Sequence, residues 1–297
     1  MLSFLPGILR GIISITIFSL NTVFWVSLLL IVSLFRIIIP LKFWYRLTSK
    51  FCIFLADRWI ICNNLGLLLL YKIEWNIKVP TELSMNEWYL VLSNHQAWVD
   101  IIVLQKIFLH RIPFLKFFLK KELIWVPVLG LAWWALEFPF MKRYTREFLE
   151  KNPHLRGKDL EVTRKACEKY KAIPISIMNF PEGTRFTERK HSRQQSPFKK
   201  LLRPRAGGIA FVLDSMDTML HKIVDVTIYY PEGAKTFWEF LCGKTTKIVV
   251  KADIIEITDN MRGDYINDTK FSKNFQKWLN DFWKQKDKML INKMKNK

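Results

Sequence analysis

A long apolar segment near the N-terminus constrains the fold of this chain more than any other feature. Residues 8–39 are almost wholly apolar, and the exceptions are Arg10, Asn21, Arg36 and a few Ser and Thr. The run 11–35 exceeds the roughly 20 residues that a helix needs to cross a bilayer. It is longer than the apolar region of a signal peptide, and no small-residue cleavage site follows it. The sequence therefore predicts a retained membrane anchor.

Two forms of this anchor are open. A single span is preferred, and the alternative is a helical hairpin that bends near Asn21 and returns. Basic residues are more frequent after the segment than before it: Arg36, Lys42, Arg46 and Lys50 against Arg10. By the positive-inside tendency, the rest of the chain is predicted to lie in the cytoplasm, at the inner membrane if the source is bacterial. Residues 51–70 are apolar but divided by charges, which favours a helix on the membrane surface over a second span.

The formal net charge of +20 predicts a negatively charged partner, either an anionic membrane surface or nucleic acid. Residues 189–205 contain seven Lys or Arg and no acid, which predicts an exposed, mobile basic loop. Aromatic residues that stack on bases are not interleaved with this run, which argues against nucleic acid. The four Cys show no Cys-x-x-Cys spacing, so we expect reduced thiols on a cytosolic face.

The remainder of the chain alternates between strand and helix patterns. Apolar or alternating runs of strand length occur at 72–79, 90–92, 173–179, 225–231 and 248–257. Helical patterns occur between and after them, at 159–170, 209–220 and 271–290. Strands separated by helices predict an α/β domain carried on the membrane anchor.

One strand ends in a turn that holds a candidate general base. Residues 90–92 lead to Asn94 and His95, and Asp100 follows five residues after the histidine. On a regular helix these two side chains would lie about 140° apart, so they meet only if the motif begins in a turn and becomes helical afterwards. Asp100 would then hold the imidazole in one tautomer and leave its other nitrogen free to take a proton from an alcohol. A structural histidine beside a buried strand is the alternative.

A second strand, at 173–179, runs into Phe-Pro-Glu-Gly-Thr-Arg at 180–185. Gly183 permits a backbone conformation in which successive amides converge on an anion. Asn-His-x-x-x-x-Asp followed about eighty residues later by this turn resembles the PlsC-like glycerolipid acyltransferases, which acylate lysophosphatidic acid. Further resemblance to the family, and to its bacterial YihG-like branch, lies in residues 121–130, 138–143, 204–208 and 278–287.

The resemblance covers most of residues 72–290 and implies a mixed sheet flanked by helices. It implies His95 and Asp100 as catalytic residues. It also implies seven substrate-binding residues: Asn94, Lys121, Arg143, Glu182, Gly183, Thr184 and Arg185. The forked donors of an Arg suit a substrate phosphate. Glu137 stands where the family usually has Gly, a departure that leaves the approach of the backbone at this position open.

The implied activity is that of a 1-acyl-glycerol-3-phosphate O-acyltransferase, which moves a fatty acyl group from a thioester to a lysophospholipid hydroxyl. The donor would be acyl-CoA or an acylated carrier protein, with no other cofactor. No Gly-x-Ser-x-Gly elbow occurs, so direct attack by the acceptor is preferred to a serine acyl-enzyme. The five His show no metal-ligand spacing, and no metal is expected.

We predict a membrane anchor over residues 1–50, an acyltransferase domain over 51–290 and a basic tail over 291–297. Two alternatives to phosphatidic acid synthesis remain. One is acylation of another lysophospholipid. The other is a membrane-tethered basic protein that binds anionic lipid or nucleic acid.

Overall fold

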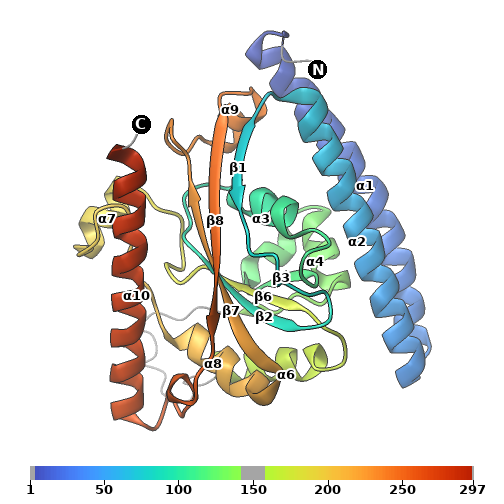
Figure 1. The fold of residues 1–297 in the computed structure, drawn as a ribbon. Coiled ribbons are helices and arrows are strands. Elements are labelled where there is room, and N and C mark those ends of the chain that lie inside the picture. The colour runs from blue at the N-terminus through green and yellow to red at the C-terminus, as the bar shows by residue number, and fades with distance from the viewer. Residues whose placement is uncertain (1–3, 142–157, 296–297) are drawn as a thin grey trace.

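The computed structural model describes residues 4–141 and 158–295 of the chain. A six-stranded mixed sheet lies between two layers of helices, and a long helical hairpin leans against one side of the domain (Figure 1). The strand order is β1-β8-β7-β2-β6-β3, and among these described strands only β7 and β8 pair antiparallel. The predicted α/β fold with a mixed sheet is therefore confirmed.

The strands of this sheet are β1 (Glu74–Lys78), β2 (Trp88–Ser93), β3 (Leu115–Phe117), β6 (Ser176–Asn179), β7 (Leu220–Tyr229) and β8 (Lys247–Glu256). A small second sheet pairs β4 (Leu119–Lys120) with β5 (Phe140–Met141). The helices are α1 (Gly7–Ile38), α2 (Lys42–Leu70), α3 (Asp100–Phe108), α4 (Leu129–Ala135), α6 (Lys158–Tyr170), α7 (Glu188–Gln194), α8 (Gly207–Met216), α9 (Phe237–Leu241) and α10 (Thr269–Lys295). Three short 3₁₀ helices complete the described elements: η1 (Lys121–Trp125), η3 (Asp217–Met219) and η4 (Asp259–Met261).

The central strand β2 is buried on both faces, which explains its continuous apolar run. Successive side chains of a strand point to opposite faces. Tyr89 and Val91 accordingly join a core with α2, α3 and α4, whereas Leu90 and Leu92 join a second core with α6, α8 and α10. The chain that follows β2 thus leaves a rigid, doubly covered strand.

The N-terminal segment forms a hairpin of two long helices and not the single helix that we preferred, and its bend does not lie near Asn21, where the alternative placed it. The helix α1 continues through Asn21, whose side-chain amide donates to Oδ1 of Asn63 on α2 at 2.9 Å. The turn occurs at 39–41, because Pro40 disfavours a helical conformation at the residue before it. The helix α2 runs from Lys42, so the predicted boundary at residue 50 falls inside a helix, and the predicted surface helix at 51–70 is the second arm of the hairpin.

Both arms are long and apolar enough to cross a membrane. In the most apolar 18-residue window of each, only 11% of the residues of α1 and 33% of those of α2 are buried. So large an exposed apolar surface is unfavourable in water and typical of contact with lipid or another protein. The hairpin therefore indicates membrane association.

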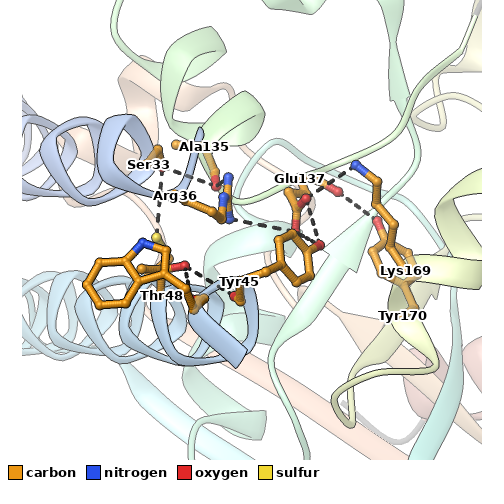
Figure 2. A network of polar contacts seen from close by, with 10 residues as sticks. Ser33, Arg36, Tyr45, Thr48, Ala135, Glu137, Lys169 and Tyr170 are labelled. Atoms are coloured by element: carbon orange, nitrogen blue, oxygen red, sulfur yellow. Dashed lines mark hydrogen bonds and ion pairs between the residues drawn. The ribbon is translucent and has the colours of Figure 1, made fainter. Parts of the chain in front are cut away.

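A cluster of charged side chains joins the bend of the hairpin to the domain (Figure 2). The carboxylate of Glu137 accepts hydrogen bonds from the hydroxyl of Tyr45 at 2.8 and 2.9 Å and from Lys169 at 3.3 Å. Arg36 lies 3.7 Å from the same carboxylate and donates to the carbonyl of Ala135 at 2.8 Å. We call these residues, with the nearby Lys116, the Glu137 cluster. It connects α1, α2 and α6 to the segment before β5.

The backbone at Glu137 is left-handed, with φ of 58°. Glycine adopts this conformation without steric cost, which accounts for the glycine that the family usually has here. This chain keeps the conformation and adds a carboxylate to it. Burial acts to raise the pKa of Glu137, but the charges of Lys116 and Arg36 outweigh it, and the net pKa lies below its ordinary value.

The segment 189–205 differs from the exposed loop that its charge predicted. It contains most of α7, and the side chains of Phe198, Leu201 and Leu202 are buried. The carboxylate of Asp287 on α10 accepts hydrogen bonds from the amides of Lys199 and Lys200 at 2.9 and 2.7 Å. Buried apolar residues among the basic ones therefore hold the segment against the domain. The helix α10 continues to Lys295, so the first part of the predicted tail is helical.

Candidate active site

The two motifs meet at the carboxyl ends of β2 and β6, which are parallel neighbours in the middle of the sheet. Ligands of open α/β sheets bind outside this end of the strands. His95 lies just after β2, and the turn 180–185 lies just after β6. The parallel pairing thus brings together two segments that are far apart in the sequence.

His95 and Asp100 form the expected pair. Nδ1 of His95 lies 2.9 Å from Oδ2 of Asp100. Residues 94–99 form a turn and α3 begins at Asp100, as the spacing predicted. Oδ2 also accepts from the amides of Gln96 and Ala97, at 2.6 and 2.9 Å, and Oδ1 accepts from the hydroxyl of Tyr230 at 2.7 Å. These donors hold the fully buried carboxylate in one position.

The imidazole of His95 is fixed on one side and available on the other. Its ring stacks on Phe180, with 4.0 Å between ring centroids and 13° between planes. With Nδ1 turned to Asp100, Nε2 has no hydrogen-bond partner in the described part of the chain. When Nδ1 carries the proton, Nε2 presents a lone pair. This arrangement suits a general base.

Glu182, in the turn after β6, is hydrogen-bonded to the segment after β2 that carries His95. Its carboxylate accepts from the amide of His95 at 2.9 Å and from the amide of Leu202 at 2.8 Å. The amide of Phe186 in turn donates to the carbonyl of His95 at 2.7 Å. Only 1% of Glu182 is exposed, and this burial raises its pKa to about 8, against the lowering effect of the two amides. Glu182 therefore positions the backbone that carries His95.

Asn94 supports the site in a similar way. It is fully buried, and its side-chain amide exchanges two hydrogen bonds of 2.8 Å with the backbone of Ile228. The side chain thereby continues the pairing of β2 with β7 while the main chain turns away. Asn94 and Glu182 are not among the residues that line the pocket beside His95, and the hydrogen bonds of both side chains go to the backbone.

A pocket of about 350 Å³ opens beside His95, and we call it the His95 pocket. Its walls come from the motif at 95–101, from β3 and β4 with their neighbours, and from β6 and the turn after it. The lining residues are His95, Trp98, Ile101, Phe117, Phe118, Leu119, Lys120, Leu123, Met178, Asn179, Phe180, Gly183, Thr184 and Arg185. Mostly apolar walls with a few polar groups are typical of a small-molecule site.

Four of the predicted site residues line this pocket: His95, Gly183, Thr184 and Arg185. Asp100 lies directly behind His95. Lys121 is exposed at the start of η1, one residue beyond the pocket-lining Lys120. Arg143 falls outside the described residues, so its predicted contact with a phosphate stays a prediction.

The structure adds residues that the sequence did not single out. Tyr230 donates to Asp100, and the guanidinium of Arg185 lies 4.3 Å from the ring centre of Trp98. Trp98 lies inside the first motif, and Tyr230 lies inside the strand predicted at 225–231, directly after the observed β7. Their positions next to the ends of β2 and β7 were the available signal. In the described ranges 4–141 and 158–295, no three His, Cys, Asp or Glu side chains gather as metal ligands.

A family model described as Acyltransferase matches residues 75–231, more than half of the chain. The mouse protein (Mus musculus) named 1-acyl-sn-glycerol-3-phosphate acyltransferase epsilon is 24% identical over 226 residues, 68% of this chain and 57% of its own. A sheep protein (Ovis aries), the alpha form, is 26% identical over 132 residues, 44% of this chain and 40% of its own. The chain thus spans about half the length of these relatives.

The crystal structure of the 1-acyl-sn-glycerophosphate (LPA) acyltransferase PlsC from Thermotoga maritima is similar, with a TM-score of 0.50. The match covers 95% of this chain and 97% of that chain at 17% identity. A likeness at this identity concerns the fold, and it extends over the hairpin as well as the α/β domain.

Proposed function

This chain belongs to the acyltransferase family, and on that premise we propose that it transfers a fatty acyl group from a thioester to the free hydroxyl of lysophosphatidic acid, forming phosphatidic acid. The proposed activity would serve phospholipid biosynthesis or remodelling. The names of the mouse and sheep relatives support the acceptor. The observation that carries the proposal is the 2.9 Å contact between His95 and Asp100, with His95 lining an apolar-walled pocket.

In the proposed reaction, the hydroxyl oxygen of the acceptor attacks the carbonyl carbon of the thioester while Nε2 of His95 takes the hydroxyl proton. The new C–O bond gives a tetrahedral intermediate, which collapses as the C–S bond breaks and its electron pair leaves on sulfur. The imidazolium then returns the proton to the thiolate, so that the products are an ester and a free thiol. Asp100 stabilises the imidazolium throughout.

The oxyanion of the intermediate needs donors beside His95. The amide of Gly183 donates to the carbonyl of Phe180 at 2.8 Å and is thus engaged within its own turn. The positive φ of Gly183, 67°, turns the backbone that follows it. The amides of Thr184 and Arg185 donate to no acceptor within the described residues, and we assign the oxyanion to this pair.

The acceptor phosphate needs positive charge at the pocket. We assign this role to Arg185 together with Arg143, since a guanidinium pairs with phosphate through two parallel hydrogen bonds. Lys120 lines the pocket and Lys121 lies just beyond it, and both add positive charge at the entrance. The hairpin would hold this entrance at an anionic membrane surface, with the domain in the cytoplasm.

The test is an assay of purified full-length protein in detergent with a panel of lysophospholipids and both donor types, read by mass spectrometry. We expect phosphatidic acid from lysophosphatidic acid, and no product from the His95→Ala variant. His221→Ala is the matched control, because His221 is exposed at the start of β7. Preference for another lysophospholipid would replace the proposed acceptor. An absence of any acyl transfer by folded wild-type protein would contradict the proposal.

A further inference from the structure

A second pocket, of about 710 Å³, shares a wall with the His95 pocket. Trp98 and Arg185 line both pockets, so this stacked pair forms the partition between them. We call the second pocket the basic pocket. Its other walls come from the start of α7, the carboxyl end of β7, the loop 233–236 and the last turns of α10.

Positive charge exceeds negative charge in the basic pocket. Its lining contains four cationic side chains and one carboxylate: Arg185, Lys190, Lys200, Lys235 and Glu188. None of the four cations forms a salt bridge within the described residues. The ammonium of Lys190 donates to Oγ1 of Thr184 at 2.7 Å, and that of Lys235 to the carbonyl of Glu232 at 3.0 Å. Uncompensated charge of this kind is suited to a phosphate, whose oxygens accept several charge-assisted hydrogen bonds.

The rest of the pocket leads from this charge to the reaction centre. Ile228, Leu290 and Met294 give it an apolar side. Tyr230 lines the pocket and also donates to Asp100 at 2.7 Å. At the inner end of the pocket, Tyr230 therefore connects the pocket wall to the carboxylate of Asp100, which contacts His95. A ligand bound here would have a phosphorylated end near the lysines and an extended end near the catalytic pair.

The proposed function needs such a ligand, and the inference rests on that function. Acyl-CoA and acylated carrier protein share one chemical unit, a phosphopantetheine whose thioester lies at the end of a long arm. The volume of the basic pocket falls within the roughly 300–1,000 Å³ of typical ligand sites. We propose that the basic pocket binds the phosphopantetheine of the acyl donor, with its phosphate at Lys190, Lys200 and Lys235 and its thioester passing Trp98 toward His95.

The assignment separates the two substrates. The donor arm enters from the basic pocket, and the acyl chain and the acceptor occupy the His95 pocket. Arg185, in the partition, lies between the two phosphates. Lys200 and Lys235 belong to the donor side alone, because they do not line the His95 pocket.

The test measures binding of CoA to full-length protein in detergent by calorimetry, independently of turnover. Lys200→Glu and Lys235→Glu should each weaken CoA binding by about tenfold, the effect of losing one charge-assisted contact of roughly 1.5 kcal/mol. Lys273→Glu, on an exposed position of α10, is the control with the same change of charge and should bind CoA normally. Thermal melts identify any variant that fails to fold.

Steady-state rates provide the second measurement. The two variants should raise KM for acyl-CoA by a similar factor and leave KM for the lysophospholipid unchanged. If acyl carrier protein is the better donor, the same KM effect with that donor supports the same site. Charge-sensitive CoA binding without any turnover would support the pocket while contradicting the proposed function. Unaltered CoA binding in both folded variants, or an effect confined to the acceptor KM, would overturn the inference.

Discussion

Two carboxylates in this molecule are withdrawn from water in different ways. Asp100 receives its hydrogen bonds from the His95 ring, two amides and a tyrosine hydroxyl, mostly within one turn of chain. Glu137 is surrounded by cations from separate elements, Arg36 on α1 and Lys169 on α6. Neutral donors that are close in the sequence fix the position of a side chain. Ion pairs between residues that are far apart in the sequence hold separate parts of a fold together. The comparison predicts that the first cluster governs rate and the second governs stability.

The strongest test of this comparison is His95→Ala. Turnover should fall by about 10²–10⁴, the usual contribution of a positioned general base. The melting temperature should change little, because His95 already lines a pocket, so loss of its ring enlarges that pocket and opens no new closed cavity. Initial rates of phosphatidic acid formation and thermal melts of the same preparations check it. A near-normal rate in folded protein would remove His95 from the mechanism.

Asp100→Asn should affect both quantities. An amide cannot stabilise the imidazolium, and we expect turnover to fall by about 10²–10³. The NH₂ group of the asparagine is itself a donor and cannot accept the hydrogen bonds that the carboxylate of Asp100 now accepts. At least one buried donor would lose its acceptor, so the free energy of unfolding should fall by about 1–3 kcal/mol. Initial rates and thermal melts of the same preparations would show the loss of turnover and the loss of stability separately. A fully active Asp100→Asn protein would contradict the orienting role.

Glu137→Gly isolates the second cluster. Glycine accepts the left-handed backbone at this position, so the variant removes the carboxylate without adding strain. Loss of its charge-assisted hydrogen bonds should lower the free energy of unfolding by about 1.5–3 kcal/mol, while turnover per folded molecule stays close to wild type. Glu137→Ala removes the same carboxylate but keeps the Cβ that is strained in the left-handed conformation, so it should be less stable than Glu137→Gly. A large loss of turnover with unchanged melting would reverse the comparison.

Lys116→Met tests the charge balance of the same cluster through pH. Lys116 is buried, and desolvation lowers its pKa to about 8. Between about pH 8 and the unfolded pKa near 10.4, the unfolded state binds more protons, so stability rises with pH and is lowest below pH 8. The variant should abolish this rise and gain roughly 1–3 kcal/mol at pH 7. Melts across pH 7–10.5, with the exposed Lys273→Met as control, would show an unchanged slope if the assignment is wrong.

The contact between His95 and Asp100 was predictable because its determinants are local. The spacing of His95 and Asp100 required a turn followed by a helix, and both lie in one continuous stretch. Tyr230 was missed because it reaches Asp100 across 130 residues, and only the pairing of β2 with β7 brings it there.

The hairpin shows a different limit of reading the sequence. Asn21 suggested an interruption of α1, but its amide pairs with Asn63, a contact that exists only when two helices pack. Pro40 was the local signal for the bend, and it lay outside the apolar run on which the prediction depended. The αL conformation of Glu137 was likewise detectable only through the glycine that the family usually has there.

The contact from Glu182 to the amide of His95 spans 87 residues. Contacts of large sequence separation form after much loop entropy has been lost, and they slow folding. The turn that presents His95 can therefore reach its working geometry only once β2 and β6 are paired and the segment at Leu202 has docked. A nascent or partly unfolded chain holds both motifs without this geometry, so under the proposed mechanism acyl transfer would be confined to molecules whose sheet is complete.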